Sequence, residues 1–198
     1  MKGEDHIVYN DKDMLVEKCI AWERTAQNAL YRLYASKMFT VCLRYSQNRE
    51  EAEDTLHEGF LKVFENIKSF HKQGSLEGWI RTIMYHSAIE KYRKRKTQDD
   101  HIVFAADDLE DMYQPIDAEV ESIISSKELI QLIQQLTPRY RMVFNLYVFE
   151  GLTHKQIAKE LKISEGTSKS NLSDARKILQ NAINKIESAT QKTIKIVK

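Results

Sequence analysis

The sequence has little glycine, proline or cysteine, and each shortage excludes a class of protein. Six glycines and two prolines in 198 residues are too few for a chain built from tight hairpins, which favours helices. The two cysteines, Cys19 and Cys42, form no C-x-x-C pair. Their spacing argues against a zinc site or a disulfide framework, and it suits a reducing compartment.

Long apolar runs are also missing. None approaches the roughly 20 residues that a membrane-spanning helix needs. The first residues, "MKGEDHIVYNDKD", are polar and acidic, unlike a signal peptide. We therefore expect a soluble, cytoplasmic protein with no membrane insertion.

Motifs for enzyme chemistry are absent too. The sequence contains no Gly-rich phosphate loop, no nucleophile elbow and no Cys/His arrangement for acyl transfer. The segment "EDTLHE" places Asp54 and His57 three residues apart on one predicted helix face. A di-metal carboxylate site needs a second copy of such a motif, and the sequence has none. We predict no enzyme activity, no catalytic residue, no metal and no cofactor.

The net charge of +1 conceals an uneven distribution. Residues 1–96 carry a net charge of +3, residues 97–122 carry −9, and residues 123–198 carry +7. The acidic strip "TQDDHIVFAADDLEDMYQPID" has no sustained hydrophobic period, and its charges repel one another. It is typical of a flexible linker between two cationic domains.

Apolar residues on both sides of this strip recur at helical spacing. Asn48 followed by Glu51 is typical of a capping box at a helix start. We expect Thr137 to cap a helix that has Pro138 at its first position and continues to Gly151. The first apolar stripe consists of Leu30, Leu33, Tyr34, Val41 and Tyr45.

The predicted fold is all-α, with two small helical domains joined by the flexible acidic linker, the second domain containing a helix-turn-helix. The predicted boundaries are 1–25 for an N-terminal extension or first helix, 26–96 for the first domain, 97–117 for the linker, 118–187 for the second domain and 188–198 for a tail.

The helix-turn-helix lies in "THKQIAKELKISEGTSKSNLSDARKIL". Thr153 is placed to cap a short helix, and Ala158 is small where a second helix must cross closely. Ile163 occupies the turn, and Ser164 or Glu165 begins the next helix. In this geometry the second helix presents its first residues to base edges in the major groove. An αα-hairpin inside a core would explain the apolar residues equally well, but not the polar helix start "EGTSKSN".

Three segments together resemble one family. The segment "LTPRYRMVFNLYVFEGLTHKQIAKELKISEGTSKSNLSDARKIL" is similar to the DNA-reading domain of extracytoplasmic-function (ECF) RNA polymerase sigma factors, within the sigma-70 family. "NREEAEDTLHEGFLKVFENIKSF" resembles the helix that these proteins dock on RNA polymerase. "GSLEGWIRTIMYHSAIEKYRKRK" resembles the segment that reads and opens the minus-ten promoter element. The resemblance covers about residues 26–185.

The resemblance implies a sigma factor that binds the clamp and flap regions of core RNA polymerase and directs promoter recognition, DNA melting and transcription initiation. It also implies an anti-sigma factor as a regulatory partner. The implied polymerase-binding residues are Glu53, Asp54, His57, Glu58 and Phe60. The implied minus-ten residues are Asn66, Lys68, Phe70, Trp79, Thr82, His86, Lys91, Arg93, Lys94 and Arg95. The implied minus-thirty-five residues are Glu165, Gly166, Thr167, Ser168, Lys169, Ser170, Asn171, Ser173, Arg176 and Lys177.

The sequence departs from the family pattern at several of these positions. His57 and His86 stand where relatives often have Gln and Asn. Ser168, Asn171 and Ser173 stand where Val, Arg and His are usual. The preferred promoter sequence therefore does not follow from the resemblance.

Other interpretations stay open at this point. Trp79 fits either the core, beside Ile80 and Ile83, or a platform on which a base stacks. The acidic linker fits either a basic channel of the polymerase or a solvated spacer. The whole chain could also be a helix-turn-helix regulator that acts without polymerase docking, such as a dimeric repressor, or a helical interaction module. A repressor should bind duplex DNA tightly by itself, whereas a sigma factor should need the polymerase.

Overall fold

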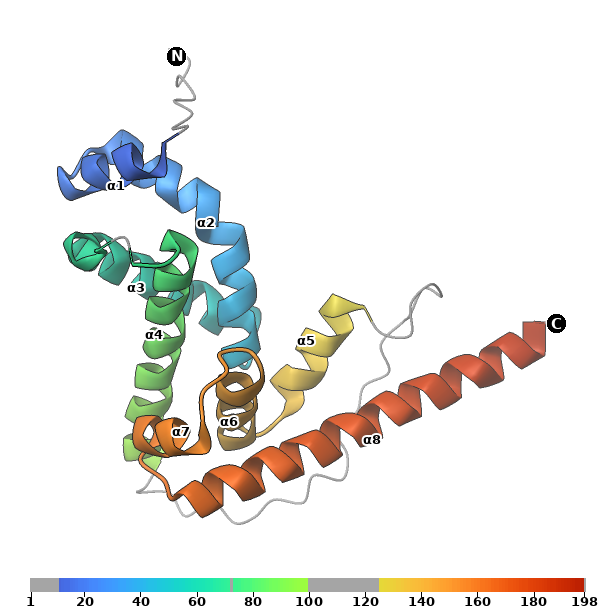
Figure 1. Ribbon diagram of the computed structural model, residues 1–198. Coiled ribbons are helices and arrows are strands. Elements are labelled where there is room, and N and C mark those ends of the chain that lie inside the picture. Colours follow the sequence, from blue (N-terminus) through green and yellow to red (C-terminus); the bar gives the residue numbers. More distant parts are fainter. Residues whose placement is uncertain (1–10, 72, 100–124, 198) are drawn as a thin grey trace. The chain divides into compact units, whose positions relative to one another are not determined.

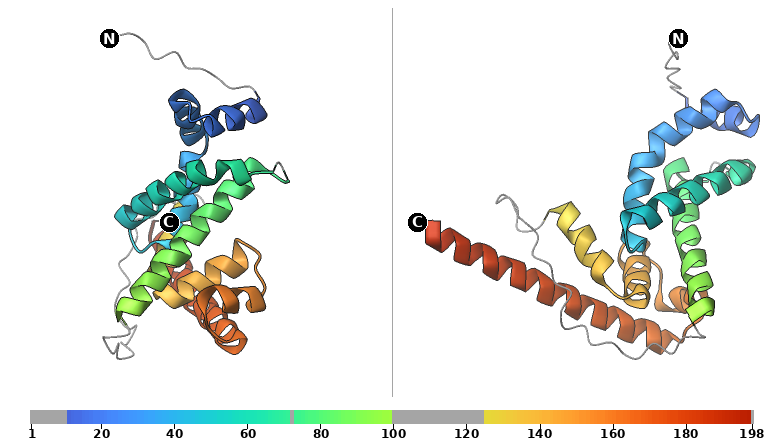
Figure 2. Two further views of the ribbon diagram at one scale, coloured as in Figure 1. Left: turned by 90° about the vertical axis from the view of Figure 1, so that its left-hand side faces the viewer. Right: turned by 180° about the vertical axis from the view of Figure 1, so that it is seen from behind.

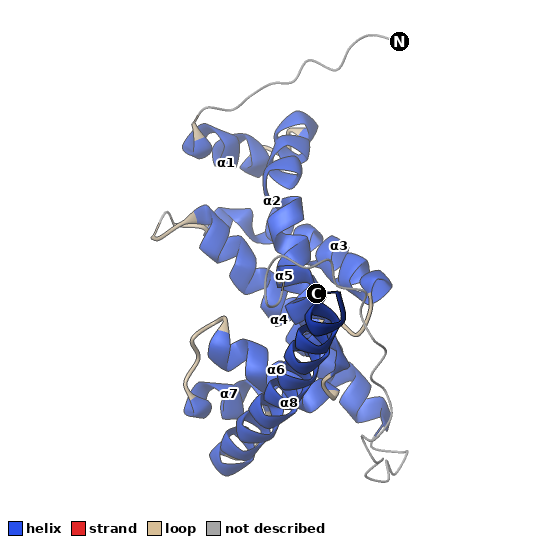
Figure 3. Ribbon diagram, turned by 90° about the vertical axis from the view of Figure 1, so that its right-hand side faces the viewer, coloured by secondary structure: helices blue, strands red, loops and turns tan. Residues whose placement is uncertain are grey.

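The computed structural model describes residues 11–71, 73–99 and 125–197, and every regular element in these ranges is a helix (Figure 3). The all-α prediction is therefore confirmed for the part of the chain that the structure describes. The elements are α1 (Lys12–Ile20), α2 (Arg24–Tyr45), α3 (Arg49–Asn66), the short 3₁₀ helix η1 (Ile67–Ser69), α4 (Leu76–Asp99), α5 (Ser126–Gln135), α6 (Pro138–Val148), α7 (His154–Leu161) and α8 (Glu165–Val197).

The chain divides into two compact units, Met1–Ala88 and Ile89–Lys198, and the division falls within α4. Most of the predicted linker, from residue 100 onward, and the predicted start of the second domain at 118–124 lie outside the described residues. Residues 97–99 form the end of α4. None of the described helices combines the length and the apolar character that crossing a membrane requires.

The first unit is built on the long helix α2. Helices α1 and α3 both pack against α2 (Figure 1), and α1 is also in contact with η1. The apolar stripe of α2 is buried as predicted, with one exception: Leu33 is 52% exposed. The buried side chains of α2 are Ala26, Leu30, Tyr34, Met38, Val41, Cys42 and Tyr45.

Side-chain caps set the starts of α3 and α4. The Asn48 carboxamide oxygen accepts from the Glu51 amide at 2.8 Å, and the Glu51 carboxylate accepts from the Gln47 amide at 2.8 Å. The predicted capping at Asn48 is confirmed, although Glu51 bonds the residue before the cap. At α4, the Ser75 hydroxyl accepts from the amide of Gly78 at 3.0 Å. These bonds satisfy amides that a helix start otherwise leaves unpaired.

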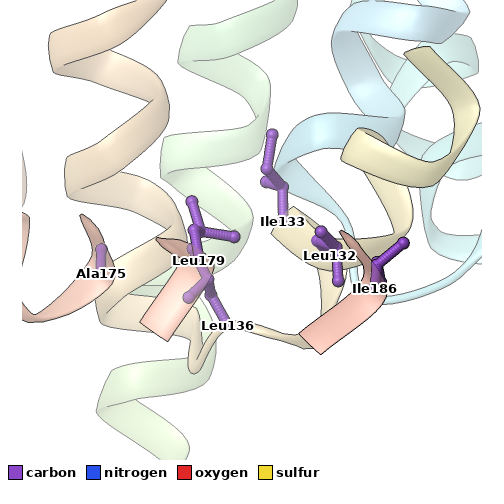
Figure 4. Packing of buried hydrophobic residues seen from close by; sticks show 6 residues of the cluster. All are labelled: Leu132, Ile133, Leu136, Ala175, Leu179 and Ile186. Atoms are coloured by element: carbon purple, nitrogen blue, oxygen red, sulfur yellow. The ribbon is translucent and has the colours of Figure 1, made fainter. Parts of the chain in front are cut away.

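One hydrophobic cluster of the second unit lies between α5 and α8. Leu132 and Ile133 of α5, with Leu136 directly after it, pack with Ala175, Leu179 and Ile186 of α8 (Figure 4). Helix α8 is one continuous helix that extends well beyond the short helices α6 and α7 of its unit (Figure 2). Besides α5, the helices α6 and α7 also pack against α8.

Two details of α6 differ from the sequence predictions. Pro138 does occupy the first helical position, but the Thr137 hydroxyl makes no capping hydrogen bond. The helix ends at Val148 rather than at Gly151, which lies in the following loop with φ of 68°. The buried Arg141 donates to the carbonyl oxygens of Gln134 and Leu136 at 2.6 and 2.8 Å. Arg141 thereby pairs carbonyls at the end of α5 and ties α5 to α6.

Candidate nucleic-acid interface

Helices α7 and α8 form the helix-turn-helix that the sequence predicts. Thr153 and Gln156 make a complete capping box at the start of α7. The turn passes through Lys162, which is left-handed with φ 52° and ψ 52°, and its amide bonds the carbonyl of Ala158. The amide of Thr167 then donates to the Ser164 hydroxyl at 2.9 Å, so Ser164 caps α8.

The start of α8 exposes a surface of short polar and cationic side chains. Such groups can hydrogen-bond base edges and phosphates, and no large apolar side chain interrupts them. Eight of the ten predicted minus-thirty-five residues are exposed: Glu165, Gly166, Thr167, Lys169, Ser170, Ser173, Arg176 and Lys177.

The other two predicted reading residues, Ser168 and Asn171, are buried, with 0% and 7% of their surfaces exposed. Both lie one turn before the buried Leu172 and Ala175, so they continue the buried stripe of α8. The Ser168 hydroxyl bonds Nδ1 of His154 at 2.9 Å. The prediction that these two side chains face DNA is therefore corrected, because their face of the helix is packed against the protein.

A row of contacts leads from Ser168 to Arg176 through two rings. The His154 ring stacks on the Tyr147 ring, with centroids 4.8 Å apart and an interplanar angle of 25°. The Arg176 guanidinium lies over the Tyr147 ring, 5.5 Å from its centroid. Tyr147 and His154 were not singled out from the sequence, because they lie seven positions apart in two different helices and no sequence pattern predicts that their rings meet. Both are half-buried.

In the first unit, Trp79, Thr82 and His86 occupy one side of α4 at helical spacing. His86 is exposed, whereas Trp79 and Thr82 are half-buried. Trp79 packs against Phe70, with ring centroids 5.7 Å apart. The indole is therefore partly exposed, and its contact with Phe70 links the end of η1 to α4.

The remaining predicted minus-ten residues lie at the end of α3, in η1 and in the later turns of α4. Asn66 and Lys68 are exposed near the end of α3, where the side-chain Nδ2 of Asn66 donates to the backbone carbonyl of Lys62 at 2.8 Å. Lys94 and Arg95 are exposed in α4, and Lys91 is half-buried. Arg93 is engaged within the second unit, where its guanidinium donates to the backbone carbonyl of Glu160 and lies 3.1 Å from its carboxylate.

Helix α3 carries the predicted polymerase-binding residues, and four of the five reach its surface. Asp54, His57 and Glu58 are exposed, and Glu53 forms an ion pair with Arg49 at 2.8 Å. Phe60 is only 2% exposed. The prediction that Phe60 lies on the docking surface is therefore wrong.

Phe60 belongs to the core because it lies four residues after the buried Leu56 on the apolar stripe of α3. Its ring packs 4.6 Å from that of Tyr31. Leu61, which sequence reasoning missed, is instead 63% exposed. It follows His57 by four residues, so Asp54, His57, Glu58 and Leu61 form one exposed face of α3, called the α3 face below.

The described ranges contain no group of three or more His, Cys, Asp or Glu side chains arranged to hold a metal ion. Cys19 and Cys42 are both buried, and neither is part of a disulfide.

Comparison with known proteins agrees with this arrangement. The chain matches the family description "Sigma-70 region 2" over residues 30–98 and "Sigma-70, region 4" over residues 126–179. It is 31% identical over 160 residues to the ECF RNA polymerase sigma factor SigW of Bacillus subtilis, covering 76% of this chain and 85% of that protein.

Two further similarities are more distant. The RNA polymerase sigma-H factor of Pseudomonas aeruginosa is 26% identical over 178 residues, covering 85% of this chain and 92% of that protein. Among solved structures, the sigma factor RpoE in complex with the anti-sigma factor NepR from Bartonella quintana matches with a TM-score of 0.49 and 22% identity, covering 81% of this chain and 97% of that chain. On the two region matches and the SigW similarity, this chain belongs to the ECF RNA polymerase sigma factors of the sigma-70 family.

Proposed function

We propose that the protein binds core RNA polymerase and directs it to promoters, so that its work in the cytoplasm is binding rather than catalysis. The first unit docks on the enzyme and holds the opened minus-ten strand, and the second unit reads the minus-thirty-five element. The observation that carries this proposal is the polar and cationic surface at the start of α8, exposed while the opposite side of the same turns is buried.

The α3 face supplies the polymerase contact. Leu61 places an apolar side chain, 63% exposed, beside the acidic side chains of Asp54 and Glu58. A buried apolar anchor within a charged rim is the arrangement that protein–protein interfaces use.

A matched pair of substitutions tests this contact. Leu61→Asp should lower the affinity for core polymerase at least ten-fold, because it puts an additional charge where an apolar anchor is needed. Leu33→Asp is the control, since Leu33 is a similarly exposed leucine of the first unit that lies on α2. Equal retention of the two variants on immobilised core enzyme would refute the assignment of the α3 face.

Unstacking a base from the duplex costs a few kcal/mol, and stacking on an aromatic ring offsets part of that cost. The Phe70–Trp79 pair and the exposed His86 offer rings to such bases. Lys94 and Arg95, in the part of α4 that belongs to the second unit, are exposed cations that can bind phosphates.

Run-off transcription with purified core polymerase on templates of random sequence tests the function as a whole. Transcripts should start at defined sites only when the protein is present. Replacing Lys169, Ser170 and Arg176 together with Ala should abolish this activity and leave the helical content unchanged. Lys185→Ala is the control, because Lys185 is an exposed cation of the same helix beyond the reading turns.

A helix-turn-helix regulator that works without polymerase would give a different result. It would shift duplex DNA in a gel at nanomolar concentration without core enzyme. Two separate cationic surfaces bind duplex DNA at only about 10⁻⁴–10⁻⁶ M through phosphate contacts. A tight shift by the free protein would therefore favour the regulator over the sigma factor.

We also propose an anti-sigma protein as a partner. A protein that covers the α3 face or the start of α8 would switch off the corresponding contact. Direct binding of such a protein to the wild-type chain that Leu61→Asp weakens, and Leu33→Asp does not, would place its binding site on the α3 face.

A further inference from the structure

Four side chains from three helices of the second unit form one row of contacts. Ser168 of α8 bonds His154 at the start of α7, with 2.9 Å between Oγ and Nδ1. The His154 ring stacks on Tyr147 of α6 at 4.8 Å. Arg176, again of α8, lies over the Tyr147 ring at 5.5 Å. The row therefore leaves α8 at one point and returns to it at another.

The spacing of these two points fixes more than a single contact would. Ser168 and Arg176 are eight residues apart, which places them just over two turns apart and about 12 Å along the helix axis. A helix that is held at two such points can neither rotate about its axis nor tilt without breaking one of them. The reading residues Lys169, Ser170 and Ser173 lie between the two points.

The pairing at Ser168 also satisfies a buried polar group. The side chain of Ser168 is fully buried. A buried hydroxyl is costly unless it is hydrogen-bonded. Either neutral tautomer of His154 can satisfy it, because Nδ1 can accept from the hydroxyl or donate to it. The polar Ser168 is thus tolerated because His154 supplies its partner.

The second end of the row acts on a phosphate contact. Arg176 is exposed, and a free arginine side chain samples many rotamers. A guanidinium lying over an aromatic face is attracted by the ring, so fewer rotamers are populated before DNA arrives. Pre-orientation of this kind improves binding by lowering the entropy that binding would otherwise lose.

We infer that His154 and Tyr147 are positioning residues for promoter reading: they hold the first turns of α8 at a set rotation and orient Arg176 toward a phosphate, without touching DNA bases themselves. This inference rests on the proposed function, because it assigns a role within the reading of the minus-thirty-five element. It predicts that changes at two half-buried rings alter DNA discrimination.

The test uses the holoenzyme, assembled from core polymerase and each full-length variant. Affinity is measured over a series of salt concentrations for a promoter with an intact minus-thirty-five element and for one with that element scrambled. His154→Phe keeps a ring on Tyr147 but removes the hydrogen bond to Ser168. It should lower the affinity for the intact promoter roughly ten-fold, the size of one good base contact, and leave the scrambled promoter unchanged.

Two further comparisons separate positioning from general stability. Adding Ser168→Val to His154→Phe replaces the polar pair by an apolar one, and it should restore the affinity to within about three-fold of wild type. Tyr147→Leu should lower the slope of log affinity against log salt by about one phosphate contact. Tyr147→Phe keeps the ring and should retain the wild-type slope.

Several outcomes would overturn the inference. One is a loss in His154→Phe that is equal on intact and scrambled promoters. Another is a double variant that binds no better than His154→Phe. A third is the same salt slope for Tyr147→Leu and Tyr147→Phe. A wild-type holoenzyme that does not distinguish the two promoters would instead refute the proposed function, so the two failures are distinguishable.

Discussion

The turn between α7 and α8 offers a prediction that can be worked out from the backbone alone. Lys162 is left-handed, with φ 52° and ψ 52°, and its side chain is exposed. An L-residue in this region loses about 1–2 kcal/mol to contact between its Cβ and the following carbonyl. Glycine removes that contact, although its freer unfolded chain costs about 0.5–1 kcal/mol. Lys162→Gly should therefore stabilise the second unit by about 1 kcal/mol.

Lys162→Ala is the control that isolates the cause. It removes the lysine charge and most of the side chain but keeps the Cβ, so it should change the stability by no more than about 0.5 kcal/mol. A gain of 1 kcal/mol corresponds to a rise in melting temperature of about 4–8 °C for a domain of this size.

The assay should report on the second unit. Both tryptophans, Trp22 and Trp79, lie in the first unit, so tryptophan fluorescence serves as an internal reference. Amide hydrogen exchange of the α5–α8 core then measures the second unit in the full-length chain. If Lys162→Gly exchanges as fast as Lys162→Ala, the left-handed turn costs nothing and the reasoning is refuted.

Three further predictions follow from single side chains. Arg141→Met should destabilise the second unit by about 3 kcal/mol in urea unfolding, because two carbonyls at the end of α5 lose their charged donor; an unchanged midpoint would contradict this. Burial, and secondarily Glu23, raises the pKa of the Cys19 thiol from 9.0 to about 11. Its contribution to stability should be complete below pH 9 and be lost as the pH rises toward 11, and Cys19→Ala should remove this decline. Hydrogen bonds from Ser125 lower the pKa of Glu128. Its contribution should be present above the pKa of an unfolded glutamate and be lost as the pH falls through the lowered value, whereas Glu128→Gln should show no such loss in an acid titration.

Local patterns predicted much of the fold. Asn48 and Thr153 cap the helices that they were expected to cap, and α8 begins where Ser164 and Glu165 indicated. These features depend on neighbouring residues in the chain, so their physical cause can be read within four or five positions.

The errors at the site have a local cause as well. Phe60 follows Leu56 by four residues, and Ser168 precedes Leu172 by four. Helical spacing puts both Phe60 and Ser168 on the buried sides of their helices. Their predicted roles in polymerase and DNA binding were instead taken from the family resemblance. A family pattern aligns positions, whereas the side of the helix on which a residue lies determines whether a partner can reach it.

The sequence by itself determined the helices, the caps at Asn48 and Thr153 and the presence of a helix-turn-helix, because those depend on contacts between residues close in the chain. Only the tertiary structure decided which side chains from different helices contact one another. The bond between His154 and Ser168 joins residues fourteen positions apart, and its partners are selected by the packing of α7 on α8. The left-handed turn at Lys162 could not be predicted either, because no glycine marks that position in the sequence. The packing of the helices on either side imposes that conformation on a lysine.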